Sequence, residues 1–158
     1  MPQIPLDEAI RQVVAVLREA IDGPPESWSY FTDNRRDAGY DGTLATVTAD
    51  EASRMISGTS IAAHTHHAAW AMRRSAAWIR GDRNRWDWSE SWRLSTVGED
   101  EWPELRELFR RSYDELREAI EANGLASDES FGGAVGAVAH AAYHLGAIRQ
   151  KVARLRMV

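Results

Sequence analysis

Cysteine is absent from this chain of 158 residues. Its absence excludes disulfide bonds, thiolate metal ligands, a cysteine nucleophile and the covalent attachment of c-type haem. Any metal ion must therefore be held by nitrogen and oxygen ligands. A thiol that took part in the chemistry of this protein would have to come from a cosubstrate.

The chain also lacks a hydrophobic run of the roughly 20 residues that a membrane-spanning helix needs. Its N-terminal segment, MPQIPLDEAIRQVVAVL, has no basic stretch ahead of its apolar residues, as a secretory signal would have. Asp7, Glu8, Arg11 and Gln12 interrupt the apolar residues themselves. We therefore expect a cytoplasmic protein with no membrane partner.

Charges of one sign do not cluster along the sequence. The formal net charge is -5, and arginines are interspersed with acidic residues, so we expect no nucleic-acid partner. A hydrophobic fraction of 44%, with 27% charged residues and seven tryptophans, is typical of a globular protein. At this length we expect one domain that comprises residues 1–158.

Four segments have apolar residues at helical spacing. The predicted helices are Leu6–Ile21, Asp50–Arg80, Trp102–Ala122 and Asp128–Leu155. Thr48 and Glu51 form a capping-box pattern before the second helix, and Ser127 is a suitable N-cap for the last one. Strand patterns are nearly absent.

Two long connections separate these helices. Residues 23–47 have no clear period, but their aromatic side chains indicate that the segment packs against the protein: Trp28, Tyr30, Phe31 and Tyr40. Residues 81–100 are rich in tryptophan and turn residues. The sequence therefore predicts an all-α fold, a four-helix bundle whose helices are not all joined by short loops.

The histidines are the main clue to chemistry. All five lie in two clusters inside predicted helices: His64, His66 and His67, and then His140 and His144. The second pair is four residues apart, so both imidazoles lie on one helix face and can bind one ion. A third histidine from the other helix would complete a site that leaves one coordination position for water or substrate.

Small residues surround the second pair, between Gly132 and Ala142. They would let a neighbouring helix approach closely and leave room for imidazoles and an ion. The alternative is an alanine-rich helix with no role in a site.

The first cluster offers several candidates for the third ligand. His64 and His67 share a helix face, whereas His66 is rotated by about 200° from His64. The face of His67 also carries small side chains such as Ala63 and Ala71, which admit a site. We favour His67, keep His64 as its rival or as a neighbour that supports a ligand, and expect His66 to face solvent or an interface.

Two common metal-site patterns are missing. Ala141 stands where the helix of a zinc protease carries its catalytic glutamate. None of the histidines has a glutamate three positions before it, so a ferritin-like di-iron carboxylate site is not expected. A mononuclear site fits better.

The segment His140-Ala-Ala-Tyr-His144-Leu-Gly146-Ala-Ile148 resembles the H-x3-H-x-G-x-I signature on the last helix of the DinB-like (DinB/YfiT) superfamily. The segment from Ser60 to His67 resembles that family's second-helix segment, in which histidines follow a serine by four and seven residues. That register selects His67 as the ligand.

The resemblance extends to the order and length of all four helices, so it covers most of the chain. Many members carry glutamate and glutamine where this chain has Ala141 and Ala147. These two differences leave the three ligands intact but change the residues around them.

The resemblance implies a four-helix bundle of up-down-down-up connectivity with two long crossover connections, and a homodimer. It also implies a divalent ion, zinc or nickel, on His67, His140 and His144. Relatives include mycothiol-dependent maleylpyruvate isomerases and transferases that use bacillithiol or related low-molecular-weight thiols.

Three hypotheses for function follow. The first is an enzyme whose three-histidine metal site activates a low-molecular-weight thiol or water towards a small-molecule substrate, as a thiol S-transferase, isomerase or hydrolase. The second is a non-catalytic stress-response module that binds a metal or ligand. The third is a b-type haem bundle, which the colour of the protein would reveal. Possible pocket residues, with no assigned role, are Arg74, Tyr143, Trp86, Trp88 and Trp92.

Overall fold

The computed structural model describes residues 3–25 and 28–157, and this part of the chain is helical without a single strand. The long helices are α1 (Leu6–Asp22), α4 (Ile61–Ile79), α5 (Glu101–Asn123) and α6 (Asp128–Leu155). The short ones are α2 (Tyr40–Ala45), α3 (Ala49–Ser53) and the 3-10 helix η1 (Trp88–Trp92). The predicted all-α class is confirmed.

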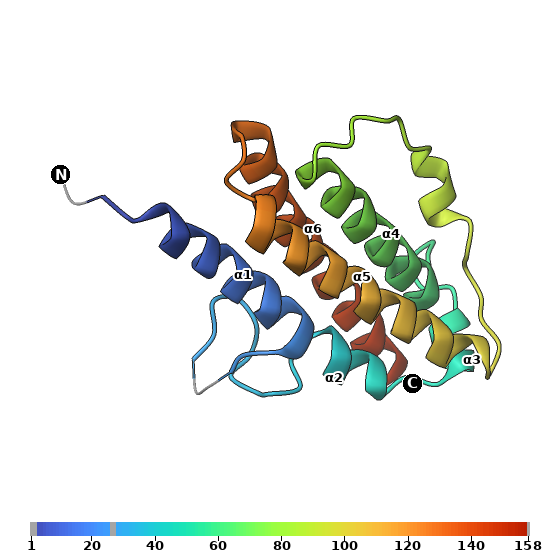
Figure 1. Ribbon diagram of the computed structural model, residues 1–158. Coiled ribbons are helices and arrows are strands. Elements are labelled where there is room, and N and C mark those ends of the chain that lie inside the picture. Colours follow the sequence, from blue (N-terminus) through green and yellow to red (C-terminus); the bar gives the residue numbers. More distant parts are fainter. Residues whose placement is uncertain (1–2, 26–27, 158) are drawn as a thin grey trace.

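The four long helices pack side by side around a common apolar core (Figure 1). Helix α4 lies at the centre of the packing, against both α5 and α6. Each long helix contributes fully buried side chains, among them Leu17, Ile61, Phe109 and Ile148. Removing one such side chain from water stabilises the fold by about 1.5–3 kcal/mol. The site-bearing helices α4 and α6 are thus held by the core on more than one side.

Local signals fix most helix ends as expected. Helix α6 has the predicted bounds, and the Ser127 side chain caps it by accepting from the Ser130 backbone N–H. Helix α1 ends one residue later than predicted, and α5 extends one residue further at each end. Caps and apolar spacing act over a few residues, so they can be read without knowledge of the tertiary fold.

The helix predicted for residues 50–80 is wrong as one continuous element. The capping box of Thr48 and Glu51 is present, but it begins the short α3, and a turn separates α3 from α4. In that turn Ser57 and Gly58 have positive φ values of 52° and 83°, and Ile56 pairs with Thr59. Positive φ cannot continue a right-handed helix, so α4 starts afresh behind its own N-cap, Ser60.

The connection between α1 and α3 contains α2, which sequence patterns did not predict. Tyr40 of α2 is fully buried, packs on Phe109 and donates a 3.0 Å hydrogen bond to the Ala141 carbonyl oxygen. This contact ties the connection to the histidine-bearing part of α6. The expectation that the segment packs through its aromatic residues therefore holds for Tyr40.

The expectation is wrong for Trp28, Tyr30 and Phe31, whose side chains are about half exposed. Their stretch of chain is held by the buried carboxylate of Glu19 instead. Both Glu19 oxygens accept backbone N–H groups, from Tyr30, Phe31 and Thr32, and one also accepts the Thr32 hydroxyl. These bonds outweigh the effect of burial and lower the pKa of Glu19.

The second long connection runs back along α4 to the start of α5, and η1 packs on α4 on the way (Figure 1). Hydrogen bonds fix its return path: the Ser60 hydroxyl donates to the Ser95 carbonyl oxygen, and the Ser53 hydroxyl to that of Val97. The Trp102 indole N–H donates to the Val47 carbonyl oxygen at 2.8 Å. A tryptophan-rich segment is thereby laid over the face of α4 that carries the histidines.

The small residues of α6 divide into two sets. Ala134, Ala137 and Ala141 are buried and face the core, as expected for close helix packing. A Cβ added at Gly132 or Gly136 would meet no described atom within 4 Å, so these glycines do not serve that purpose. Among the described helices, none is both long and apolar enough to cross a membrane.

Candidate metal centre

The two histidine clusters meet between α4 and α6. One ring nitrogen from each of His67, His140 and His144 lies within 4.8 Å of the other two. This is the set that the sequence predicted. His67 and His144 are buried, and His140 is partly exposed.

The closest pair within the set already has nearly the spacing of metal ligands. The Nε2 atoms of His67 and His140 are 3.1 Å apart. Two nitrogens bound tetrahedrally to zinc at about 2.0–2.1 Å would lie roughly 3.3–3.4 Å apart. The third nitrogen, from His144, lies within 4.8 Å of both.

A serine of η1 determines the orientation of His67. Nδ1 of His67 lies 2.8 Å from the Ser91 hydroxyl, which itself donates to the Trp88 carbonyl oxygen at 2.6 Å. The Ser91 oxygen therefore accepts the proton of Nδ1, and the lone pair of His67 is on Nε2, facing His140. The ring also stacks on Trp92, with 4.0 Å between centroids and planes 19° apart.

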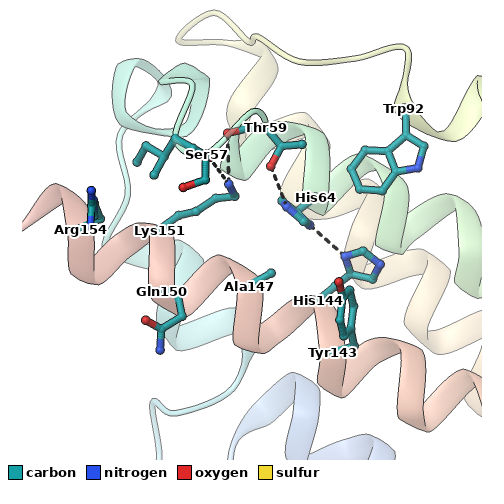
Figure 2. A pocket seen from close by; sticks show the side chains of 11 residues that line it. Ser57, Thr59, His64, Trp92, Tyr143, His144, Ala147, Gln150, Lys151 and Arg154 are labelled. Atoms are coloured by element: carbon teal, nitrogen blue, oxygen red, sulfur yellow. Dashed lines mark hydrogen bonds between the residues drawn. The ribbon is translucent and has the colours of Figure 1, made fainter.

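His64 lies behind His144, outside the set of three. Its Nδ1 is 2.9 Å from Nδ1 of His144, and its Nε2 is 3.0 Å from the Thr59 hydroxyl (Figure 2). Contact with His144 leaves Nε2 of that residue as the ring nitrogen open to an ion. His64 is thus placed to orient a ligand, the second of the two roles considered for it.

His66, which we expected to face solvent or an interface, is half-buried against η1. Its Nδ1 lies 2.8 Å from the Ser91 carbonyl oxygen. This contact points the ring away from His140 and His144, so His66 does not join the set.

Burial makes the clustered imidazoles neutral at physiological pH. Desolvation lowers the pKa of His64 and His67 to about 4 and that of His144 to about 3, and it lowers the pKa of His140 as well. Repulsion from neighbouring imidazolium charges adds to the effect at His67 and His144. Neutral rings keep the lone pairs that a metal ion requires.

A cavity of about 560 Å³ opens beside the set, which is a size suited to a small molecule. It is lined by Ile56, Ser57, Thr59, His64, Trp92, Tyr143, His144, Ala147, Gln150, Lys151 and Arg154 (Figure 2). Tyr143, 72% exposed, stands at its rim with its ring edge against His144.

Of the pocket residues suggested by sequence, Trp92 and Tyr143 line the cavity, whereas Arg74, Trp86 and Trp88 are not among its lining residues. Arg74 lies over the rings of Trp78 and Trp86, and Trp88 packs on Trp70. Four residues at the site were not predicted from the sequence: Ser91, Thr59, Lys151 and Arg154. The two cations carry a weak signal, because they follow His144 by seven and ten residues and so fall on its face of the helix.

Comparisons of this chain with models of protein families, with curated proteins and with solved structures found no match. The chemistry of the site is therefore the guide to function.

Proposed function

We propose that this protein is a metal-dependent enzyme of the DinB-like (DinB/YfiT) type, with one divalent ion, zinc or nickel, on His67, His140 and His144. The observation that supports this most is the 3.1 Å approach of the Nε2 atoms of His67 and His140, with His144 beside them. Three neutral imidazoles without a carboxylate form a donor set that suits zinc or nickel better than magnesium or calcium.

The residues around the set favour a metal over a purely structural cluster. With Ser91 accepting the Nδ1 proton of His67, two ring nitrogens face each other at 3.1 Å and share at most the proton of His140. A proton on Nδ1 of His144 would be accepted by His64, whose own Nε2–H reaches the Thr59 hydroxyl. In this arrangement Nε2 of His67 and Nε2 of His144 have free lone pairs, and the Nδ1–H groups of both residues have acceptors.

When bound, such an ion lowers the pKa of a thiol or water in its remaining position and so supplies a nucleophile at neutral pH. The chain's own residues hold the ligand rings, and the cavity admits an electrophilic small molecule next to His144. Since the chain has no cysteine, a reacting thiol would be a cosubstrate. The reaction classes are those of a thiol S-transferase, an isomerase or a hydrolase.

The up-down-down-up connectivity of α1, α4, α5 and α6 is part of the proposal. It requires α4 and α5 to run in the same direction. Contacts near both ends support this: Ser60 at the start of α4 bonds to Ser95 just before α5, and Arg80 after α4 bonds to the carbonyl oxygen of Glu115 in the second half of α5. Residues 81–100 supply the length that such a return needs.

A homodimer is also part of the proposal. The stretch from Ser130 to Ile148 contains no Asp, Glu, Lys or Arg. Phe131, Val135 and Tyr143 are exposed along it. An exposed apolar helix face of this kind is suited to a second copy of the chain.

A second candidate function is a non-catalytic module that binds a metal or ligand. Two observations favour it: Ala141 stands between the ligand histidines of α6, and none of the described residues that line the cavity is Asp or Glu. A carboxyl group that acts as general acid or base is therefore not supplied by the cavity wall.

Metal content tests the shared part of both candidates. The protein, purified without chelators, should carry one divalent ion per chain by mass spectrometry of the elements. His144→Ala should lose stoichiometric binding of zinc and nickel in titrations. His66→Ala should retain it, because the His66 ring faces η1 and not the other histidines of the set. Absence of the ion, or equal binding by His144→Ala, would overturn the proposal.

Turnover separates the two candidates. Pairs of a low-molecular-weight thiol and an electrophile are offered to the metal-loaded protein. Turnover that disappears in His67→Ala supports the enzyme, whereas stoichiometric metal with no turnover on any pair supports the module.

A further inference from the structure

The cavity beside His144 is basic, although the chain as a whole has a net charge of -5. Its charged lining residues are Lys151 and Arg154, and no acidic side chain is among the described residues that line it. Figure 2 shows both cations on α6, beyond His144 and Ala147. The cavity therefore has one candidate metal ligand, His144, at one end and two cations at the other.

Lys151 is the unusual member of this pair, because it is only 6% exposed and lies in no ion pair with a described residue. Its ammonium group donates to the carbonyl oxygens of Ile56 and Thr59, which leaves one of its three donors for another acceptor. Burial lowers the pKa of Lys151, because desolvation disfavours the charged ammonium group. An anion in the cavity would stabilise that charged form. Buried lysines normally have an acidic partner.

The wall opposite Lys151 is formed by a defined turn. Ser57 has a φ of 52°, which is rare for a residue with a side chain, and Gly58 follows with 83°. The turn directs two carbonyl oxygens at the ammonium group, so that Lys151 is held at one place in the cavity. The same turn supplies Thr59, whose hydroxyl reaches His64.

Helix geometry sets the distance between the two ends of the cavity. Lys151 follows His144 by seven residues, or two turns, which is about 10 Å along the helix axis. Side chains on a helix lean towards its N-terminus, so His144, Lys151 and Arg154 lean in the same direction and keep this spacing. An acid bound by the two cations would therefore lie about 10 Å from a group at His144.

We propose, resting on the function proposed above, that the ligand of this cavity is an elongated anionic small molecule. Its carboxylate or phosphate binds Lys151 and Arg154, and its reacting group lies beside His144. The two ends are separated by a chain of about five to seven atoms, as the spacing along α6 requires.

Matched probes test whether Lys151 and Arg154 bind an anion, and the test needs no metal ion. Hexanoate and hexan-1-ol are titrated into the isotope-labelled protein, as purified, and amide shifts are followed by NMR. Hexanoate should shift the amides of Thr59, Lys151 and Arg154 and bind at least about tenfold more tightly than the alcohol, because a charge-assisted hydrogen bond is gained. Hexyl phosphate, run in parallel, identifies which of the two acids binds better.

Arg154 provides a variant that should fold normally, because its side chain is exposed. Arg154→Gln should weaken hexanoate binding several-fold and leave hexan-1-ol binding unchanged. Arg156→Gln is the matched control, since Arg156 points away to Glu51 and the Thr46 carbonyl oxygen. Equal affinity for hexanoate and hexan-1-ol, or equal losses in the two variants, would overturn the proposal.

A second pair of probes separates this proposal from the metal-dependent function. 6-Mercaptohexanoate and 6-mercaptohexan-1-ol are titrated before and after zinc is added. Preference for the acid with a gain from zinc supports both proposals. Preference for the acid with no gain from zinc supports the anion site and counts against the metal function.

Discussion

The hydroxyl of Ser91 lies 2.8 Å from Nδ1 of His67. Through this hydrogen bond, a residue in a long connection controls which nitrogen of a candidate ligand is free. Ser91 is completely buried, so His67 has no water to replace the bond.

We therefore expect Ser91→Ala to weaken zinc binding by roughly 10–100-fold, the usual cost of removing a group that orients a metal ligand. Competition against a chromophoric chelator measures the affinity. Ser89→Ala is the control, because Ser89 is an exposed residue of the same 3-10 helix. Equal affinities for the two variants would show that Ser91 has no such role.

The metal-free protein should lose stability on mild acidification. His64, His67 and His144 have folded-state pKa values of about 3–4, below the unfolded value of 6.5. Their contribution to stability is fully present above about pH 6.5 and is lost as the pH falls towards 4, because the unfolded chain binds more protons. We expect Tm to fall by roughly 5 °C or more between pH 7 and pH 5.

Carboxyl groups with lowered pKa values change their protonation below pH 5. The change in Tm between pH 7 and pH 5 therefore reflects mainly the protonation of the histidines. Differential scanning fluorimetry at a series of pH values measures it. His144→Gln should flatten the profile, and a wild-type Tm that is constant over this range would contradict the expected protonation states.

Two glycines of α6 should respond in opposite ways to alanine. Gly136→Ala should raise the free energy of unfolding by about 0.5–1 kcal/mol, since alanine favours the helix and its Cβ meets no described atom. At Gly133 a Cβ would lie 3.0 Å from Cδ1 of Trp78, so the same change should bring no gain or a loss. Urea unfolding followed by circular dichroism compares the two variants. Equal increases in the free energy of unfolding would mean that the Trp78 side chain moves aside at little cost.

Replacing Glu19 by glutamine should destabilise the fold by about 2–3 kcal/mol. The amide keeps the size of the side chain but replaces one acceptor oxygen by a donor that faces backbone N–H groups. Glu8→Gln, at a partly exposed position of the same helix, should change little. The free energy of unfolding in urea gives both values, and similar effects would argue against Glu19 as the anchor of residues 30–32.

Local patterns predicted much of this fold because they act within a few residues. The last helix, Asp128–Leu155, has its predicted bounds since Ser127 caps it and its apolar positions keep one period. The break at Ser57 was missed because the helix formers on both sides outweighed the short run from Ser57 to Ser60, although its Ser-Gly pair is a turn signal. A serine can adopt the conformation found there only when the surrounding structure imposes it.

The candidate site likewise contains residues that local patterns predicted and residues that they did not. Spacing within one helix predicted His140 and His144, and a face of the other helix narrowed the third member to His67 or His64. Ser91 could not be predicted, because the path of residues 81–100 depends on tertiary contacts such as those of Ser95 and Val97. Residues that support a site from an aperiodic segment leave no periodic signal.

Covering His67 with η1 also has a kinetic consequence. The segment that holds Ser91 and Trp92 contributes few side chains to the core, so it can detach locally while α4 and α6 remain packed. Detachment removes the hydrogen bond to His67 and bares the ring to solvent. The lifetime of a bond between His67 and an ion would then depend on this local opening and would not require global unfolding.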